Sequence, residues 1–106
     1  MTDATTIRDL NDRFRQTLIG GRVMLTCGIV GRDDTQTILD LVQTFNNFTD
    51  GDDPYGEHDF GAFDQEGEKI FWKIDYYDAG MTAGSPDPAD TAVTTRVLTV
   101  MLAEEY

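Results

Sequence analysis

The residues between 50 and 68 carry the densest set of reactive side chains in the chain. One histidine stands there among eight acidic residues, without any lysine or arginine. Carboxylates and an imidazole can bind a divalent metal ion, and two carboxylates across a cleft can divide the acid and base roles of a hydrolase. One hypothesis is therefore a divalent-metal-binding protein or small hydrolase that uses this acidic loop. Its candidate residues are Asp50, Asp52, Asp53, Glu57 and His58.

None of the catalytic or ligand-binding motifs that spacing alone can identify is complete in this sequence. An EF-hand loop starting at Asp50 would place Pro54, Tyr55 and Gly61 where it needs an oxygen ligand, a glycine and a glutamate. A phosphate-binding glycine loop and a Gly-x-Ser-x-Gly elbow are both missing. The single histidine and the single cysteine, Cys27, are too far apart for a zinc pattern. The sequence therefore assigns no catalytic residue and no cofactor.

The charge of the chain is strongly acidic and unevenly distributed. Twenty acidic residues stand against eight basic ones, giving a net charge of −12, and residues 49–106 hold most of it. A charge of this sign repels phosphate backbones, so we expect no direct binding to nucleic acid. No apolar run approaches the roughly 20 residues that span a bilayer, and the N-terminus lacks the features of a secretory signal. We expect no membrane attachment and a cytoplasmic location.

The acidic residues that follow residue 58 could instead form a protein-binding surface. Strands space their residues by about 3.3 Å along the chain and about 4.8 Å across the sheet, distances similar to those between phosphates along a nucleic-acid strand. Such a surface could enter a basic, nucleic-acid-binding groove of a protein partner, whereas the alternative is that acidity only keeps the domain in solution. A homodimer through the hairpin edge is open, although its charges oppose it. The candidate partner-binding residues are Asp59, Asp64, Glu66, Glu68, Asp75 and Asp78.

Helical spacing of apolar residues predicts two helices in the N-terminal half. The first ends at the glycine pair Gly20 and Gly21, and the second begins at Asp33 or Asp34 as its N-cap. The expected core-facing residues are Ile7, Leu10, Phe14 and Leu18 in the first helix and Ile38, Leu41, Val42, Phe45 and Phe48 in the second. Between the two helices, the apolar run 22–30 predicts a buried strand with Cys27 as a small apolar residue.

The runs HDFGAFD and EKIFWKIDYYD predict a β-hairpin after a loop over residues 49–57. A three-residue turn would pair Asp64 with Glu68 and place Phe60 and Ala62 on the same face as Trp72. We expect this register, because a two-residue turn sets the charged Asp59 opposite Ile74 and mixes charge into the apolar face.

The last segment of the sequence predicts a proline-rich loop and a final helix. Pro86 and Pro88 exclude a regular element over residues 79–90, and Asp90 or Thr91 then offers an N-cap. The apolar residues of this expected helix are Val93, Val97, Val100 and Met101. The resulting order α-β-α-β-β-α predicts one compact α+β domain over residues 1–106, with helices packed on a small sheet that contains the hairpin.

Several blocks of the sequence together resemble a known family over almost the whole chain. These blocks are LNDRFRQT, GGRVMLT, DDPYGEHDFGAF, FWKIDYYD and DPADTAVTTRVLTVMLAEEY. They are similar to small acidic bacterial proteins of unknown function found in plasmid and prophage-like mobile elements. The resemblance carries no activity onto particular residues. It implies a setting in which small acidic proteins act as inhibitors of host defence, such as anti-CRISPR and antirestriction proteins.

The leading hypothesis from the sequence is a small protein-binding protein that acts stoichiometrically through its acidic hairpin. It would inhibit a host defence complex as a nucleic-acid mimic, and it would not be an enzyme. Its partner would carry a basic, nucleic-acid-binding surface, so that association is fast and sensitive to salt. The metal or hydrolase hypothesis is the alternative.

Overall fold

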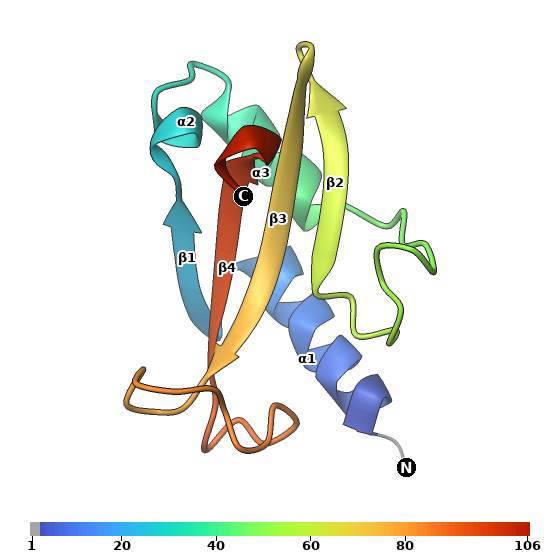
Figure 1. Cartoon of the computed structure of the whole chain (residues 1–106), viewed down its shortest axis with the longest axis vertical. Helices are drawn as coiled ribbons and strands as arrows, with labels where there is room; N and C mark the ends of the chain where they lie inside the picture. Colours follow the sequence, from blue (N-terminus) through green and yellow to red (C-terminus); the bar gives the residue numbers. More distant parts are fainter. Residues whose placement is uncertain (1–2) are drawn as a thin grey trace.

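A computed structural model describes residues 3–106 of the chain, which form helices and strands in one α+β domain (Figure 1). The expectation of an α+β domain is thereby confirmed. The elements in chain order are α1 (Asp3–Thr17), β1 (Gly21–Leu25), α2 (Cys27–Val30), α3 (Thr35–Gln43), β2 (Phe60–Gln65), β3 (Glu68–Tyr77), β4 (Thr95–Leu102) and the 3₁₀ turn η1 (Ala103–Glu105).

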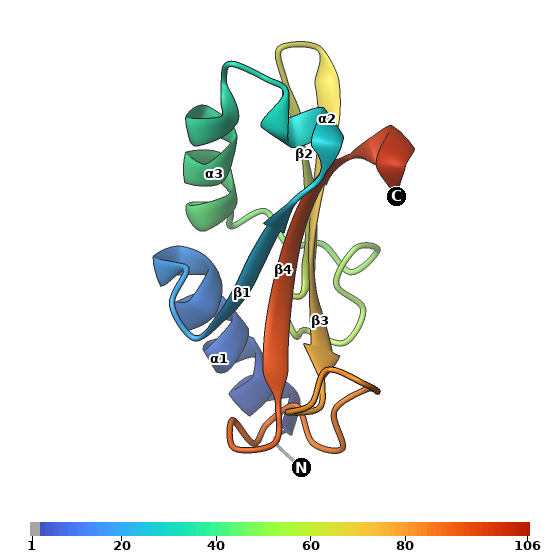
Figure 2. The same cartoon turned by 90° about the vertical axis from the view of Figure 1, so that its left-hand side faces the viewer.

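The four strands form one mixed sheet in the order β1-β4-β3-β2. β3 is antiparallel to both β2 and β4, whereas β1 is parallel to β4. α1 and α3 lie on one side of this sheet, and η1 lies on the other, where the chain ends (Figure 2). We call the sheet face directed away from α1 and α3 the outer face. The domain therefore has two layers, and no long helix of residues 3–106 covers the outer face.

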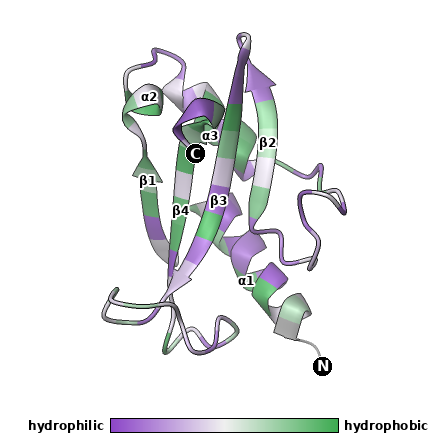
Figure 3. Ribbon diagram, viewed as in Figure 1, coloured by the Kyte–Doolittle hydropathy of each residue, from purple (hydrophilic) through white to green (hydrophobic). Residues whose placement is uncertain are grey.

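The hydrophobic core lies between the helices and the inner sheet face. Trp72, at the middle of β3, is fully buried, and Phe14, Ile38 and Leu98 pack around it from two helices and the neighbouring strand. In Figure 3, hydrophobic and hydrophilic positions alternate along β3, as expected for a strand with one face in the core. The apolar periodicity of the two helices thus predicted most of their core contacts, although Leu41 is exposed because α3 directs Ile38 and Val42 inward instead.

The hairpin register differs from the one that we expected. Gln65 pairs with Glu68, so Glu66 and Gly67 alone form the turn, and both have positive φ. Such backbone angles belong to the tight two-residue turn whose twist matches that of the strands. Phe60 and Ala62 therefore lie on the outer face. Gly61 lies on the inner face opposite Trp72. That position requires glycine, because a β-carbon there would lie within 2.6 Å of the indole Cε2.

The expected final helix is a strand. Residues Thr95–Leu102 form β4, which pairs with β1 on one side and with β3 on the other. The prediction was wrong because the run RVLTVML is apolar on nearly every side chain, as suits a central strand that is covered on both faces. Half of the eight residues of this strand are β-branched, and a strand between two neighbours satisfies its backbone groups on both sides.

The expected strand over residues 22–30 is shorter and is not buried. It ends at Leu25, and Thr26 starts a single helical turn, α2. Cys27 occupies the first position of that turn and is exposed, which corrects the expectation of a buried thiol. Ile29 is the residue of α2 that enters the core. The strand is exposed because it forms an edge of the sheet, where helices cover only part of it.

Replacement of Gly61 by alanine tests the packing of β2 against Trp72. The added β-carbon would overlap the indole ring and the ring of Phe45, so we expect Gly61→Ala to lower the free energy of unfolding by about 1–3 kcal/mol. Urea denaturation followed by tryptophan fluorescence measures this loss. Gly51→Ala is the matched control, because its β-carbon would enter open space and should leave stability almost unchanged. Equal stability of both variants and the parent would contradict the described contact.

Candidate functional site

The five residues of the expected metal or hydrolase site do not converge in the structure. Asp50 and Asp52 are exposed on the loop before β2, whereas Asp53 is buried. The carboxylate of Glu57 turns toward the Tyr76 hydroxyl, which donates a hydrogen bond of 2.9 Å to it. Asp53 and His58 do lie close together. Within residues 3–106, no three histidine, cysteine or acidic side chains are arranged so as to hold a metal ion.

The side chain of His58 holds the acidic loop before β2 against α1. Its Nδ1 lies 2.9 Å from an Asp12 carboxylate oxygen, and its Nε2 lies 3.7 Å from Asp53 Oδ2. The imidazole stacks on the Phe48 ring at 3.7 Å with the two planes parallel. Asp53 also accepts a hydrogen bond of 3.0 Å from the His58 backbone N–H. Both ring nitrogens thus face carboxylates and one ring face is covered, so this histidine positions the loop.

A buried network of hydrogen bonds lies next to these contacts of His58 and joins α1, β3 and β4. Arg96 of β4 donates a 2.7 Å hydrogen bond to the Asn11 side-chain oxygen, and Asn11 donates to the Tyr76 hydroxyl at 2.8 Å and to the Glu57 carbonyl at 3.0 Å. Burial raises the pKa of Tyr76 and lowers the pKa of Arg96. Burial disfavours the charged form of either side chain, and the hydrogen bonds offset that cost.

Arg15 supplies a second buried cation on the inner side. Its guanidinium donates to the backbone carbonyls of Val42 and Gln43 at 2.9 and 3.2 Å and lies 5.2 Å from the Trp72 ring centroid. Burial lowers its pKa, whereas the nearby Asp12 opposes that shift. Arg15 therefore closes the end of α3 and joins it to α1.

Sequence reasoning missed these buried polar residues. A signal existed for two of them, because Arg96 is the only charged residue in an apolar run and Asn11 stands at helical spacing between Ile7 and Phe14. No signal pointed from Arg96 to Asn11, which lie 85 positions apart.

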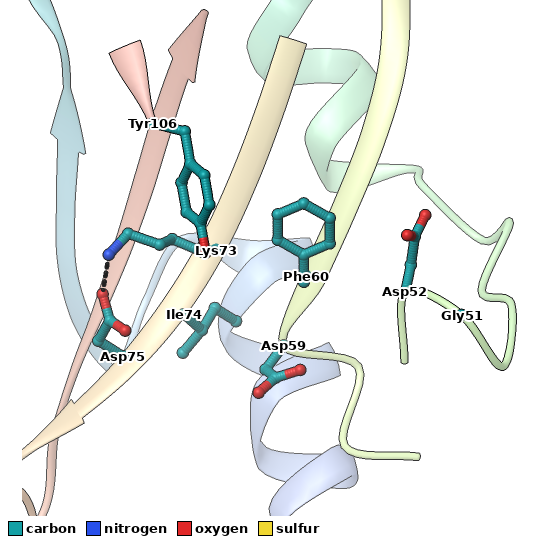
Figure 4. A pocket seen from close by; sticks show the side chains of 8 residues that line it. All are labelled: Gly51, Asp52, Asp59, Phe60, Lys73, Ile74, Asp75 and Tyr106. Carbon is teal, nitrogen blue, oxygen red and sulfur yellow. Dashed lines mark ion pairs between the residues drawn. The ribbon is translucent and has the colours of Figure 1, made fainter. Parts of the chain in front are cut away.

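The outer face carries a hollow of about 340 Å³ at the lower end of β2 and β3 (Figure 4). Lys73 reaches across to Asp75, with its Nζ 2.7 Å from a carboxylate oxygen, and so extends away from Asp59 and Asp52. Within residues 3–106, Asp52 and Asp59 form no ion pair. The hollow is lined by Gly51, Asp52, Asp59, Phe60, Lys73, Ile74, Asp75 and Tyr106.

Asp59 is the most perturbed carboxyl group of this hollow. The two-residue hairpin turn places it opposite Ile74, whose N–H donates to the Asp59 carbonyl at 2.9 Å. Partial burial raises the pKa of Asp59, and the negative charges of Glu57, Asp53 and Asp75 add to that rise. A carboxylate held in this way is stabilised by any cation that approaches it from outside. The hollow is therefore a place where a positive group would bind favourably.

The six residues of the expected partner-binding surface occupy three places along the hairpin. Asp59 and Asp75 lie at the hollow, and Asp64, Glu66 and Glu68 lie at the turn of the hairpin. Asp64 is 3.5 Å from Lys69. Asp78 accepts hydrogen bonds from the backbone and hydroxyl of Thr82, which lower its pKa and fix the loop after β3. The expectation did not include Phe60 and Tyr106, which line the hollow because of the observed register and η1.

The fold and the hollow define this chain as a two-layer α+β domain with a hollow on its outer side that Asp52, Asp59 and Asp75 line. The chain belongs to the family described as "Protein of unknown function (DUF3768)", whose model matches residues 25–105. The matched range holds the whole hollow except Tyr106, whereas α1 lies before it. No curated protein and no solved structure matches the chain. Within residues 3–106, no helix combines the length and apolarity that a membrane span requires.

The raised pKa of Asp59 predicts a pH-dependent effect of its replacement. A carboxyl group with a raised folded-state pKa contributes stability below its unfolded-state pKa, and this contribution is lost as the pH rises through the folded-state value. At neutral pH, Asp59→Asn should therefore raise the free energy of unfolding, by up to about 1 kcal/mol for a partly exposed charge. This gain should disappear below pH ~4, where both states of the parent bind the proton.

Thermal unfolding of the parent and the variant across this pH range checks the prediction. Asp50→Asn, which removes an exposed charge from the same loop, is the control for the change in net charge. An equal gain from both variants at neutral pH would contradict a specific destabilisation at Asp59.

Proposed function

We propose that this protein acts by binding a protein partner, and that the outer face receives a basic side chain of that partner. The observation that carries the proposal is the hollow, whose lining includes the carboxylates of Asp52 and Asp59 and the rings of Phe60 and Tyr106 (Figure 4). An arginine guanidinium is the side chain that this combination suits best, because it binds carboxylates through hydrogen bonds and aromatic rings through its planar face.

The distribution of exposed charge supports a basic partner. The exposed basic residues are Arg13, Arg22 and Lys69, and one of them pairs with Asp64. The exposed acidic residues outnumber them and occur on nearly every segment: Asp9, Asp33, Asp40, Asp50, Asp52, Asp64, Glu66, Asp87, Asp90, Glu104 and Glu105. A surface of one sign accelerates association with a surface of the opposite sign and makes that association sensitive to salt.

We further propose that the partner is a nucleic-acid-binding protein of a host defence system, which this chain inhibits as a nucleic-acid mimic of the anti-CRISPR or antirestriction type. The resemblance to proteins of mobile elements motivates this more specific form. The hollow supports it, because its aspartates and aromatic rings together resemble the phosphates and bases of a nucleic-acid strand in their chemistry. Stoichiometric binding would then compete with the nucleic acid.

Neutralisation of the hollow tests the proposed binding. We expect Asp52→Asn together with Asp59→Asn to weaken capture of the partner from host lysate by about tenfold, which corresponds to roughly 1.4 kcal/mol of lost electrostatic attraction. Capture by the parent should be strong at low salt and weak at high salt. Quantitative mass spectrometry of the retained proteins provides the measurement, and recovery of a nuclease subunit would support the mimic.

The matched control places the same charge change on the opposite side of the domain. Asp9→Asn together with Asp40→Asn alters exposed residues of α1 and α3 and should leave capture within about twofold of the parent, as expected for distant charges. A third variant, Glu66→Gln with Glu68→Gln, separates the hairpin turn from the hollow. Equal capture by all variants, or capture that ignores salt, would contradict the proposal.

A further inference from the structure

Four of the seven large apolar side chains that are exposed within the described residues lie on or near the edge strand β1. Ile19 precedes the strand and is 76% exposed, Met24 within it is 57% exposed, and Val30 after it is 62% exposed. Val23 adds a fourth partly exposed apolar residue. Figure 2 looks onto this edge, and β1 lies in front with no other element drawn along its outer side.

The backbone of β1 has one side without a neighbouring strand. β1 pairs only with β4, and the N–H of Thr26, just beyond the strand, donates to the Val100 carbonyl at 3.1 Å. Backbone groups alternate in direction along a strand, so those of Arg22 and Met24 also face β4. The N–H and C=O groups of Gly21, Val23 and Leu25 therefore point away from the sheet and can pair with a further strand.

The segment around β1 is basic, whereas the molecule as a whole is acidic. Residues 13–32 contain no acidic residue and hold four of the eight basic residues of the chain. Glu105 lies just beyond the end of β1, where its carboxylate accepts hydrogen bonds from Thr26 Oγ1 and from the Gly28 and Leu102 N–H groups. Two copies of a chain with net charge −12 can approach each other here without bringing their carboxylates together.

The other edge of the sheet carries several acidic residues, whereas Arg22 is the one charged residue of β1. β2 is flanked by Asp59 and Glu66, and Asp64 lies within it near its end. Charged residues at a sheet edge prevent pairing with another chain. This contrast singles out β1 as the edge that accepts a strand, whereas the hairpin edge, which the sequence suggested for a homodimer, opposes it.

We propose that β1 pairs with the β1 strand of a second copy of this chain, antiparallel across a two-fold axis, so that the two sheets become continuous. A two-fold interface uses the same surface on both copies, and the apolar residues around β1 would then face one another. Strand addition satisfies the outward backbone groups of both copies. Five paired residues make a small interface compared with the roughly 800 Å² per partner of a standard one, so the dimer dissociates on dilution. This pairing is independent of the partner proposed for the outer face.

Sedimentation of the full chain over a concentration series tests this pairing. The parent should shift from 11.9 kDa toward twice that mass as its concentration rises. Val23→Glu with Met24→Glu should raise the dimer dissociation constant by about tenfold or more, because each face of the joined sheet then gains two carboxylates near the two-fold axis. Leu41→Glu with Tyr55→Glu is the matched control, since it replaces exposed apolar residues elsewhere with the same charge and should dimerise as the parent does.

Hydrogen exchange of the parent tests the same interface without any substitution. The amides of Gly21, Val23 and Leu25 should exchange more slowly at high concentration than at low concentration, whereas the exposed loop amides should not change. A parent that stays monomeric at its highest soluble concentration would overturn the proposal. A dimer that both double variants retain, with no change in exchange at β1, would overturn it as well.

Discussion

The buried guanidinium of Arg96 is the constraint on which the arrangement of the acidic loop depends. It joins β4 to Asn11 of α1, and Asn11 in turn holds the Glu57 carbonyl and the Tyr76 hydroxyl. The loop over residues 46–59 has no helix or strand of its own, so these bonds and the contacts of His58 decide its course. A buried cation with incomplete hydrogen bonding would be costly, and the polar groups are therefore fixed as a set.

The two long helices pack against one face of the sheet only, which explains why the hollow lies on the outer face. These helices bury Trp72 and its neighbours on the inner face. The outer face is covered only in part, by η1 and by the loop after β3 (Figure 2). Three structural features form its hollow: the tight turn at Glu66 and Gly67, the path of the acidic loop, and the return of the C-terminus over β3.

The sequence predicted the fold class, both long helices and the hairpin, because local periodicity determines these features. It failed at β4, where an apolar run flanked by a helix-capping residue suits a helix as well as a central strand. The predicted hairpin register was also wrong, because it avoided the cost of placing Asp59 opposite Ile74. The favourable backbone geometry of the two-residue turn outweighs that cost. The sequence identified Asp52 as a candidate of the metal or hydrolase site and identified Asp59 and Asp75 as candidates of the partner-binding surface. Their convergence with Tyr106 depends on contacts between distant segments that no local pattern encodes.

The parallel pairing of β1 with β4 has a consequence for the order of folding. Thr26 and Val100, which are bonded at the end of this pair, lie 74 positions apart, so closing the chain between them costs more entropy than forming the hairpin. During synthesis the segment of β1 leaves the ribosome long before its only neighbour in the sheet exists. Its apolar residues therefore have no strand partner until β4 has been synthesised, and β1 cannot join the sheet before then.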